Sequence, residues 1–383
     1  MIRVRSALVA VWMAAPLSAF AQSQSQTQTP PQQPQPPAET PGVEAPLRYR
    51  FSGYLRLEGT VVQNDPDVAF IGRNDGFTLA NARVAVAGTW RDRIAFKISA
   101  DGAEDEREDA NATEGTLRFA LKDAWADFKL ARAATIRGGQ FYPLFDLEEI
   151  TGQDEMWFVD RALESRGTRA TEGWESQGLG AGRSIGVAVR APRALGNDSI
   201  ALGYEVVAQN GNGENESAND NDALAYGASL FLSLPRDSVI AVSGRHNRRT
   251  EGDLPFRQVE EDVSGAASAQ IEVGPARVAG QVIGRSTTFP STGGPSENAL
   301  GAHAQAMFRI VAGKMAVEPG YRFAMLDPSD LITTDLVQEH TVGVNLLIPD
   351  ARARLQLNFT HSVEQAGRAL DNDRAELMLQ VGL

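Results

Sequence analysis

A long-running alternation of apolar and polar residues constrains the fold of this chain more than any other feature. From residue 49 to residue 57 every second position is apolar or glycine, and mostly polar or charged residues stand between them. The same period of two returns at 224–234, 300–310, 315–325 and 377–383. Successive side chains of a β-strand point to opposite faces, so this period predicts strands with one apolar and one polar face.

We predict about sixteen such strands. They are expected near residues 48–63, 76–90, 93–101, 117–130, 133–142, 184–192, 198–209, 223–234, 237–246, 258–273, 275–286, 298–311, 313–326, 335–348, 351–362 and 373–383. The links between them alternate between tight turns, such as 235–236, and long polar loops, such as 143–182. Short turns on one rim and long loops on the other are typical of an even-stranded transmembrane antiparallel β-barrel. A soluble β-sandwich gives no reason for this strict alternation.

The first residues of the chain predict export. A cationic start, Met1–Arg5, precedes an apolar stretch that closes with a small-x-small triplet at 19–21, which is typical of a cleaved secretory signal over residues 1–21. Residues 22–46 are nearly all Gln, Ser, Thr, Pro, Glu and Ala, and they predict a disordered leader. Residues 47–383 are then expected to form the barrel, in the bacterial outer membrane.

Composition argues against several classes of protein. The chain has no cysteine, which excludes disulfides, thiolate metal sites and cysteine nucleophiles. Its four histidines show no HExxH or other paired spacing, and the glycine-rich run 178–182 lacks the strand and helix that would make it a phosphate-binding loop. We therefore expect no metal, no cofactor and no nucleic-acid partner. No run of about twenty apolar residues follows the signal, so a membrane role must come from strands.

Charge is distributed unevenly. The eight predicted loops together hold 30 Asp and Glu against 9 Lys and Arg, a net charge of −21; they are 64–75, 101–116, 143–182, 210–222, 247–257, 287–297, 327–334 and 363–372. The whole chain carries −13, so the remainder carries +8. On the predicted register, arginines outnumber acids on the inward face, and such a surplus attracts anions into a narrow pore. Alternatively, the acidic loops are merely solvated or bind cations that bridge lipopolysaccharide, and most inward arginines pair with a neighbouring acid.

The longest predicted loop, 143–182, contains large apolar residues that would be poorly placed on an exposed loop. Trp157, Phe158 and Leu163 are the clearest examples. We predict that this third long loop folds into the barrel, packs on the wall through these three anchors and narrows the pore.

Residues 139–187 resemble the family of phosphate-selective porins O and P. The stretches that carry the resemblance are GQFYPLFDLEE at 139–149, FVDRAL at 158–163 and GRSIGV at 182–187, with Asp160 in place of the usual Glu. The runs 77–88 and 121–125 are also similar, so the resemblance covers roughly residues 76–190.

The resemblance implies a sixteen-stranded, trimeric outer-membrane channel whose inward third loop lines the constriction. It does not by itself establish phosphate selectivity, because family members with a marked anion preference line the constriction with stacked arginines and lysines. The third loop of this chain has nine acids against three arginines. Leu383 also departs from the terminal aromatic residue of most such barrels.

We therefore expect a homotrimeric porin for passive diffusion of small anionic solutes such as phosphate or polyphosphate, in contact with outer-membrane lipid and lipopolysaccharide. The residues expected at the pore lining and constriction are Arg56, Arg83, Arg137, Glu148, Glu149, Arg161 and Arg183. A general or weakly cation-selective porin and a non-conducting structural or adhesive barrel are the alternatives. An enzyme is not expected, because neither His246 nor His361 at the predicted rims adjoins a nucleophile motif.

Overall fold

The computed structural model describes residues 46–73, 75–105, 116–173, 175–197, 199–252, 255, 257–365 and 367–383. The predicted signal peptide at 1–21 lies outside the described residues, and so does the predicted leader at 22–46 apart from residue 46. Both stay predictions.

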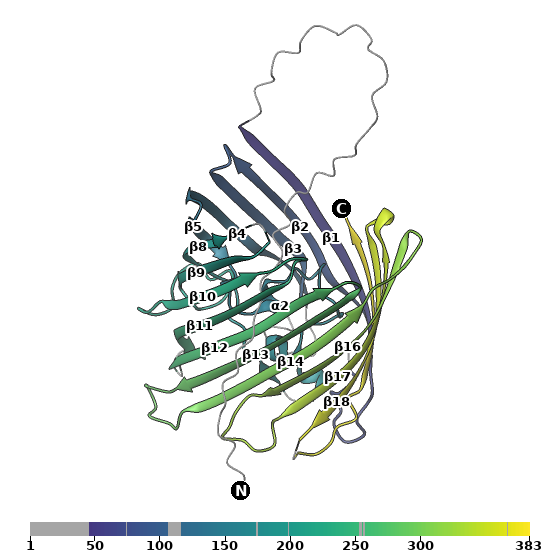
Figure 1. Ribbon diagram of the computed structural model, residues 1–383. Helices are drawn as coiled ribbons and strands as arrows, with labels where there is room; N and C mark the ends of the chain where they lie inside the picture. Colours follow the sequence, from purple (N-terminus) through teal and green to yellow (C-terminus); the bar gives the residue numbers. More distant parts are fainter. Residues whose placement is uncertain are drawn as a thin grey trace, which may run out of the picture.

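The described chain forms one closed antiparallel barrel (Figure 1). Its strands are β1 (Leu47–Val62), β2 (Gly76–Trp90), β3 (Ile94–Asp105), β4 (Leu117–Ala131), β5 (Ala134–Phe141), β8 (Ser184–Gly196), β9 (Ala201–Gln209), β10 (Ala225–Ser233), β11 (Val239–Glu251), β12 (Gln258–Val273), β13 (Ala276–Thr288), β14 (Glu297–Phe308), β15 (Ile310–Ala312), β16 (Met315–Asp327), β17 (Val337–Ile348), β18 (Ala353–Glu364) and β19 (Arg374–Gly382). The segments β14 and β15 share one position, because both pair with β16. The barrel closes where β1 pairs with both β2 and β19. The predicted sixteen-stranded β-barrel is confirmed.

The two rims differ as the sequence predicts. The turn after β2 places Arg91 and Asp92 at φ 49° and 54°, and the turn after β10 places Arg236 and Asp237 at φ 60° and 53°. Positive φ at two central residues is the hairpin geometry that fits the right-handed twist of paired strands. These tight turns share one rim with the start of β1, since Leu47 pairs with Trp90.

Some strands extend into predicted loops. Strand β11 continues to Glu251, whereas the sequence predicts that this strand ends at residue 246. Asn247 and Arg249 keep the inward parity of this strand and pair with Asp262 and Glu260 of β12. The loop predicted at 247–257 is therefore shorter than expected. Its first residues are polar because they face the barrel interior, and a polar run in a sequence is easily interpreted as a loop.

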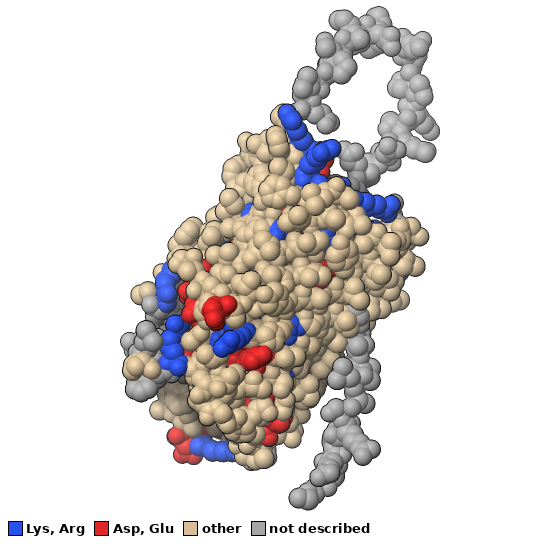
Figure 2. Space-filling model, turned by 90° about the vertical axis from the view of Figure 1, so that its left-hand side faces the viewer, with Lys and Arg blue, Asp and Glu red and all other residues tan. Residues whose placement is uncertain are grey.

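The barrel is apolar outside and polar inside. In β19, Leu377, Leu379 and Val381 are exposed, whereas Glu376 and Gln380 are buried. Figure 2 shows a broad outer band with few charged residues, and the larger groups of charged side chains lie toward the two ends. A strand in lipid needs this pattern, with apolar side chains facing the hydrocarbon and polar ones facing a watery lumen.

The remaining elements are short. Between β5 and β8 lie α2 (Leu147–Ile150), α3 (Leu163–Arg166), β6 (Gly167–Thr168), η1 (Ala170–Glu172) and β7 (Ser176–Gln177), and η2 (Pro349–Ala351) forms part of a tight turn. Figure 1 labels α2 among the strands of the barrel. In the part of the chain that the structure describes, no helix is long and apolar enough to cross a membrane.

Candidate functional site

The central part of segment 143–182 is held by hydrogen bonds from inward side chains to its backbone carbonyls. Donors on four strands reach four carbonyls between residues 156 and 160: Arg354 Nη1 to Met156 O at 2.9 Å, Asn345 Nδ2 to Trp157 O at 2.9 Å, Arg56 Nη2 to Val159 O at 2.8 Å, and Arg322 Nη1 to Asp160 O at 2.8 Å. These strands are β18, β17, β1 and β16. The guanidinium groups of this region are therefore used to hold the backbone.

The first part of the segment is bonded to other strands. The Leu144 amide donates to Glu205 of β9 at 2.7 Å, and the Leu147 amide donates to Gln281 of β13 at 2.8 Å. Asp146 caps α2 by accepting the Glu148 amide at 2.8 Å. The segment is thus joined to strands on widely separated parts of the barrel circumference.

The three predicted anchors are buried. Trp157 and Phe158 pack against Ala279 and Met307, and Leu163 packs in a second apolar cluster with Ile283. Two cations lie over the aromatic rings: Arg277 is 4.8 Å from the Trp157 centroid and Arg322 is 4.8 Å from that of Phe158. These contacts combine apolar burial with cation–π attraction.

Glycines on the inner wall make room for the segment. A side chain at Gly301 would lie 2.3 Å from the Glu164 Cβ, and one at Gly343 would lie 3.0 Å from the Phe158 ring. A residue larger than glycine at position 301 would therefore displace α3.

A group of carboxylates lies where α2 and α3 meet β13 and β14. A hydrogen bond of 2.5 Å joins Glu164 Oε1 to His303 Nδ1. Gln281 Nε2 donates to Asp146 Oδ1 at 2.9 Å. Glu148 accepts from Gln305 Nε2 at 3.0 Å. Burial, with the charge of Glu164 beside it, raises the pKa of Asp146 to about 6.

Glu149 turns away from this group. Its carboxylate accepts the amides of Ala181 at 2.9 Å and Gly182 at 3.1 Å, so it joins the start of the segment to its end. Burial, followed by the nearby charge of Asp146, raises the pKa of Glu149 to about 7. The two adjacent predicted site residues Glu148 and Glu149 thus make different contacts.

Two parts of the barrel interior can be distinguished by their bonds to the segment. Residues on β1, β2, β9, β10, β11, β13, β14 and β16–β19 hydrogen-bond to 143–182. We call these strands the tethered wall. Among the described residues, no hydrogen bond joins 143–182 to β3, β4, β5 or β8, and we call these four strands the free wall.

On the free wall, inward side chains pair with one another. Arg137 makes a two-point ion pair with Asp127, at 2.7 and 2.8 Å, and stacks 3.5 Å above the Trp125 ring. Lys97 pairs with Asp123 at 2.8 Å. These ion pairs line the free wall with charged side chains that do not bond to segment 143–182.

On β1 and β2 of the tethered wall, which border the free wall, Arg56 and Arg83 are joined through polar side chains. Asn81 accepts from Arg56 at 3.0 Å and donates to Asp101 at 2.8 Å, and Asp101 pairs with Arg83 at 3.2 Å. Gln153 of the segment accepts from Asn81 at 2.9 Å. The structure therefore brings these two predicted residues together, whereas Arg137 lies apart with its own partner.

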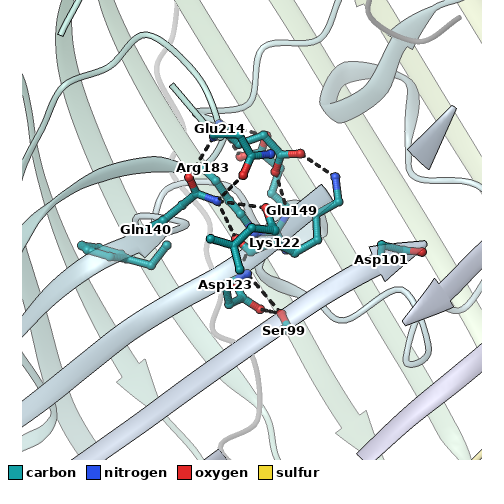
Figure 3. Close-up of polar contacts among 12 residues, drawn as sticks. Ser99, Asp101, Lys122, Asp123, Gln140, Glu149, Arg183 and Glu214 are labelled. Carbon is teal, nitrogen blue, oxygen red and sulfur yellow. Dashed lines mark hydrogen bonds and ion pairs between the residues drawn. The ribbon is translucent and has the colours of Figure 1, made fainter. Parts of the chain in front are cut away.

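Arg183 belongs to a second polar group, shown in Figure 3. Its Nε donates to Asp123 at 3.1 Å, its Nη1 donates to Glu214 at 3.2 Å, and its guanidinium lies 4.0 Å from the Tyr142 ring centroid. Glu214 also accepts from Lys122 Nζ at 2.5 Å. Lys122 and Glu214 were not predicted as site residues.

A β-bulge explains why Lys122 was missed. Ser99 pairs with Asp123 and Ala100 pairs with Leu121, so Lys122 is the extra residue on β4. A bulge re-aims side chains, and here both Lys122 and Asp123 are buried. Alternation counted back from Asp123 places Lys122 on the opposite face, whereas alternation from the exposed Phe119 and Leu121 places it inward.

Three half-buried arginines make no ion pair among the described residues. Within the described residues, no carboxylate lies at ion-pair distance from Arg161, Arg245 or Arg285. Arg161 makes a single long hydrogen bond, to Thr151 O at 3.4 Å. Arg245 and Arg285 both pair in register with Ser264, so they face the same side of the sheet on either side of β12, about 10 Å apart from the strand spacing.

The closed barrel, its apolar belt and its charged interior together define an outer-membrane porin, a channel of the bacterial outer membrane. Residues 51–231 match the family described as phosphate-selective porin O and P, which confirms the resemblance seen in the sequence. No curated protein matches the chain.

Solved structures of similar fold include outer-membrane proteins. OmpT of Vibrio cholerae in its trimer form matches with a TM-score of 0.59 at 11% identity, over 88% of this chain and 100% of that chain. The outer membrane channel DcaP of Acinetobacter baumannii matches with a TM-score of 0.59 at 12% identity, over 89% and 98%. An anion-selective porin from Comamonas acidovorans matches with a TM-score of 0.54 at 11% identity, over 88% and 100%. At these identities the likeness concerns the fold.

Proposed function

We propose that this porin passes small anionic solutes, such as phosphate or polyphosphate, by passive diffusion. The observation that carries the proposal is the pair Arg245 and Arg285, which face the lumen without an acidic partner among the described residues. This pair lies one row nearer the long-loop rim than Ser243, whose hydroxyl bonds to Phe145 of the segment. It would attract anions at the entrance, where a low-dielectric wall strengthens the field.

The proposal assigns the constriction to segment 143–182. Its bonds to the tethered wall would leave the solute path along the free wall, past Arg137 and Arg183, with Arg83 of β2 at its border. Arg56 would hold the segment, and Arg161, Glu148 and Glu149 would be charged residues of the segment itself at the constriction. Trp157, Phe158 and Leu163 would anchor it. No catalytic role and no cofactor are part of this proposal.

The assembly is proposed to be a homotrimer, because similar folds include a trimeric form. The exposed apolar belt would contact lipid, and the acidic loops would contact lipopolysaccharide through divalent cations. Residues 1–21 would be removed during export, which leaves residues 22–46 as a leader to the barrel.

Reversal potentials in a potassium chloride gradient test the anion preference. We expect the wild type to pass chloride in preference to potassium. Replacing both entrance arginines, R245Q with R285Q, should lower the chloride-to-potassium permeability ratio by about fivefold, since a unit charge a few ångströms away contributes roughly 1 kcal/mol even in water. R248Q is the matched control, because Arg248 is exposed on the outer face of the same strand.

A wild type that prefers potassium would overturn the anion assignment. A general, weakly cation-selective porin would then be the better description, consistent with the acidic segment. A wild type that inserts but never conducts would instead favour a structural or adhesive barrel.

A further inference from the structure

In the polar group around Arg183, the Glu214 carboxylate bridges two cationic side chains, Lys122 and Arg183. Glu214 places Oε1 at 2.5 Å from Lys122 Nζ and Oε2 at 3.2 Å from Arg183 Nη1. Lys122 and Arg183 are both more than nine-tenths buried. Each carboxylate oxygen thus faces one cation, as a bound carboxylate ligand would (Figure 3).

Glu214 reaches this position from a connection, not from the wall. It lies between β9 and β10, in the sequence Gly211-Asn-Gly-Glu-Asn215, where Gly211, Gly213 and Asn215 have φ values of 81°, 105° and 63°. Three left-handed residues in five, of types that tolerate this conformation, fold the connection into a tight tip. The tip carries the carboxylate to the free wall.

The tip is fixed by Gln140 of β5. The Gln140 side chain accepts the Asn215 amide at 2.8 Å and donates to the Lys122 carbonyl at 3.0 Å. At the base of the connection, Ser184 Oγ accepts the Gly211 amide at 3.0 Å. Gln140 therefore connects the tip that carries Glu214 to the bulge that carries Lys122, and it is a positioning residue for the contact.

The cations of the group are placed independently of Glu214. Lys122 lies inward at the β-bulge of β4, and Arg183 is held by Asp123 and by the Tyr142 ring. Removing the Glu214 side chain would leave both positive groups in place around a space the size of a carboxylate. A carboxylate from solution has the charge and the two-oxygen geometry to fill it.

We infer that Lys122 and Arg183 form a binding site for small carboxylates on the pore wall, occupied in this structure by the protein's own Glu214, which competes with solutes for the site. The inference extends the proposed anion function to a solute class and rests on it for its role in transport. A carboxylate tethered nearby acts at a high effective concentration, in the millimolar range or above. Glu214 would thus keep solutes from binding so tightly that they block the pore.

Thermal unfolding of the full chain in detergent tests the site without requiring conduction. Acetate is the probe, exchanged for chloride at constant ionic strength, and the variants are Glu214→Ala and Glu216→Ala. Glu216 is an exposed acid two residues away with no ion pair among the described residues, so it is the matched control. A ligand that binds only the folded state raises the unfolding midpoint as its concentration rises.

We expect acetate to raise the midpoint of E214A, with an apparent dissociation constant about tenfold below that of the wild type or lower. E216A should behave as the wild type. Adding Lys122→Gln to E214A should abolish the response to acetate. An E214A midpoint that is the same in acetate and chloride would overturn the inference, as would an equal response in E216A.

This outcome is separable from that of the proposed function. Reversal potentials report whether the pore prefers anions, whereas the midpoint reports whether acetate binds. A cation-preferring channel whose E214A variant still responds to acetate would keep the site and remove the proposed transport role.

Discussion

The tethered wall and the free wall differ in whether any of their arginines bond to segment 143–182. On the tethered wall, arginines such as Arg354 and Arg322 donate to backbone carbonyls of segment 143–182. On the free wall, Arg137 and Lys97 pair with carboxylates of neighbouring strands. An inward arginine therefore has no fixed role in this barrel, and its partner decides whether it holds a segment or contributes charge to the pore wall.

Removing the bonded segment should have the largest effect. Deletion of residues 153–173 eliminates every hydrogen bond from Arg354, Asn345, Arg56 and Arg322 to the segment. Single-channel conductance should rise severalfold if the segment narrows the pore. Deleting 290–295, in the connection between β13 and β14, is the control and should leave conductance near the wild-type value. Equal conductance in both deletions would place the constriction elsewhere.

Matched substitutions on the two walls should have a smaller and different effect. Arg354→Met removes the donors to the Met156 and Asp154 carbonyls, and an unbonded buried carbonyl costs about 1–3 kcal/mol. We expect a more mobile segment, measured as greater open-channel current noise. Arg137→Met on the free wall should leave the noise unchanged and shift the reversal potential instead. The comparison fails if both variants change the same property.

The smallest effect should come from pH. Because the pKa of Glu149 is about 7 in the folded protein and its ordinary value is 4.5, the folded state retains a proton that the unfolded segment loses between these values. Stability of the segment therefore falls as pH rises from about 4.5 to about 7 and is constant above that range. Current noise should increase over this interval, and Glu149→Gln should flatten the dependence. Asp146, with a pKa of about 6, contributes in the same direction. Its titration should account for the pH dependence that remains in the Glu149→Gln variant.

The strands were predictable because their signal is local. Residues 76–90 and 258–273 were predicted residue for residue, since period-two alternation needs no information from the rest of the chain. Burial of Trp157, Phe158 and Leu163 follows from their size and apolar character. The predicted roles of the seven charged site residues remain proposals.

The contacts that distinguish the two walls could not be predicted in the same way. A bulge in β4 puts both Lys122 and Asp123 on the inward face, so no single alternating register through this strand places both of them correctly. Glu214 meets Lys122 across 92 positions of the chain. The one visible signal was the run Gly211-Asn-Gly-Glu-Asn215, which indicates a sharp tip but not the strand that it reaches. Arg354 and Arg56 donate to backbone carbonyls, which every residue has, so the sequence of segment 143–182 gives no signal of these bonds.

The pairing of β1 with β19 has a consequence for how the barrel assembles. Each of the other neighbouring strand pairs joins segments that follow one another along the chain, so hairpins can form in sequence order. The contact between Leu57 and Leu379 must instead wait until nearly the whole chain is present, and contacts of such long range are slow to form. Until then both terminal strands expose unpaired edges that can pair with other chains. Weakening this seam should slow assembly and favour aggregation more than an equal loss within any hairpin.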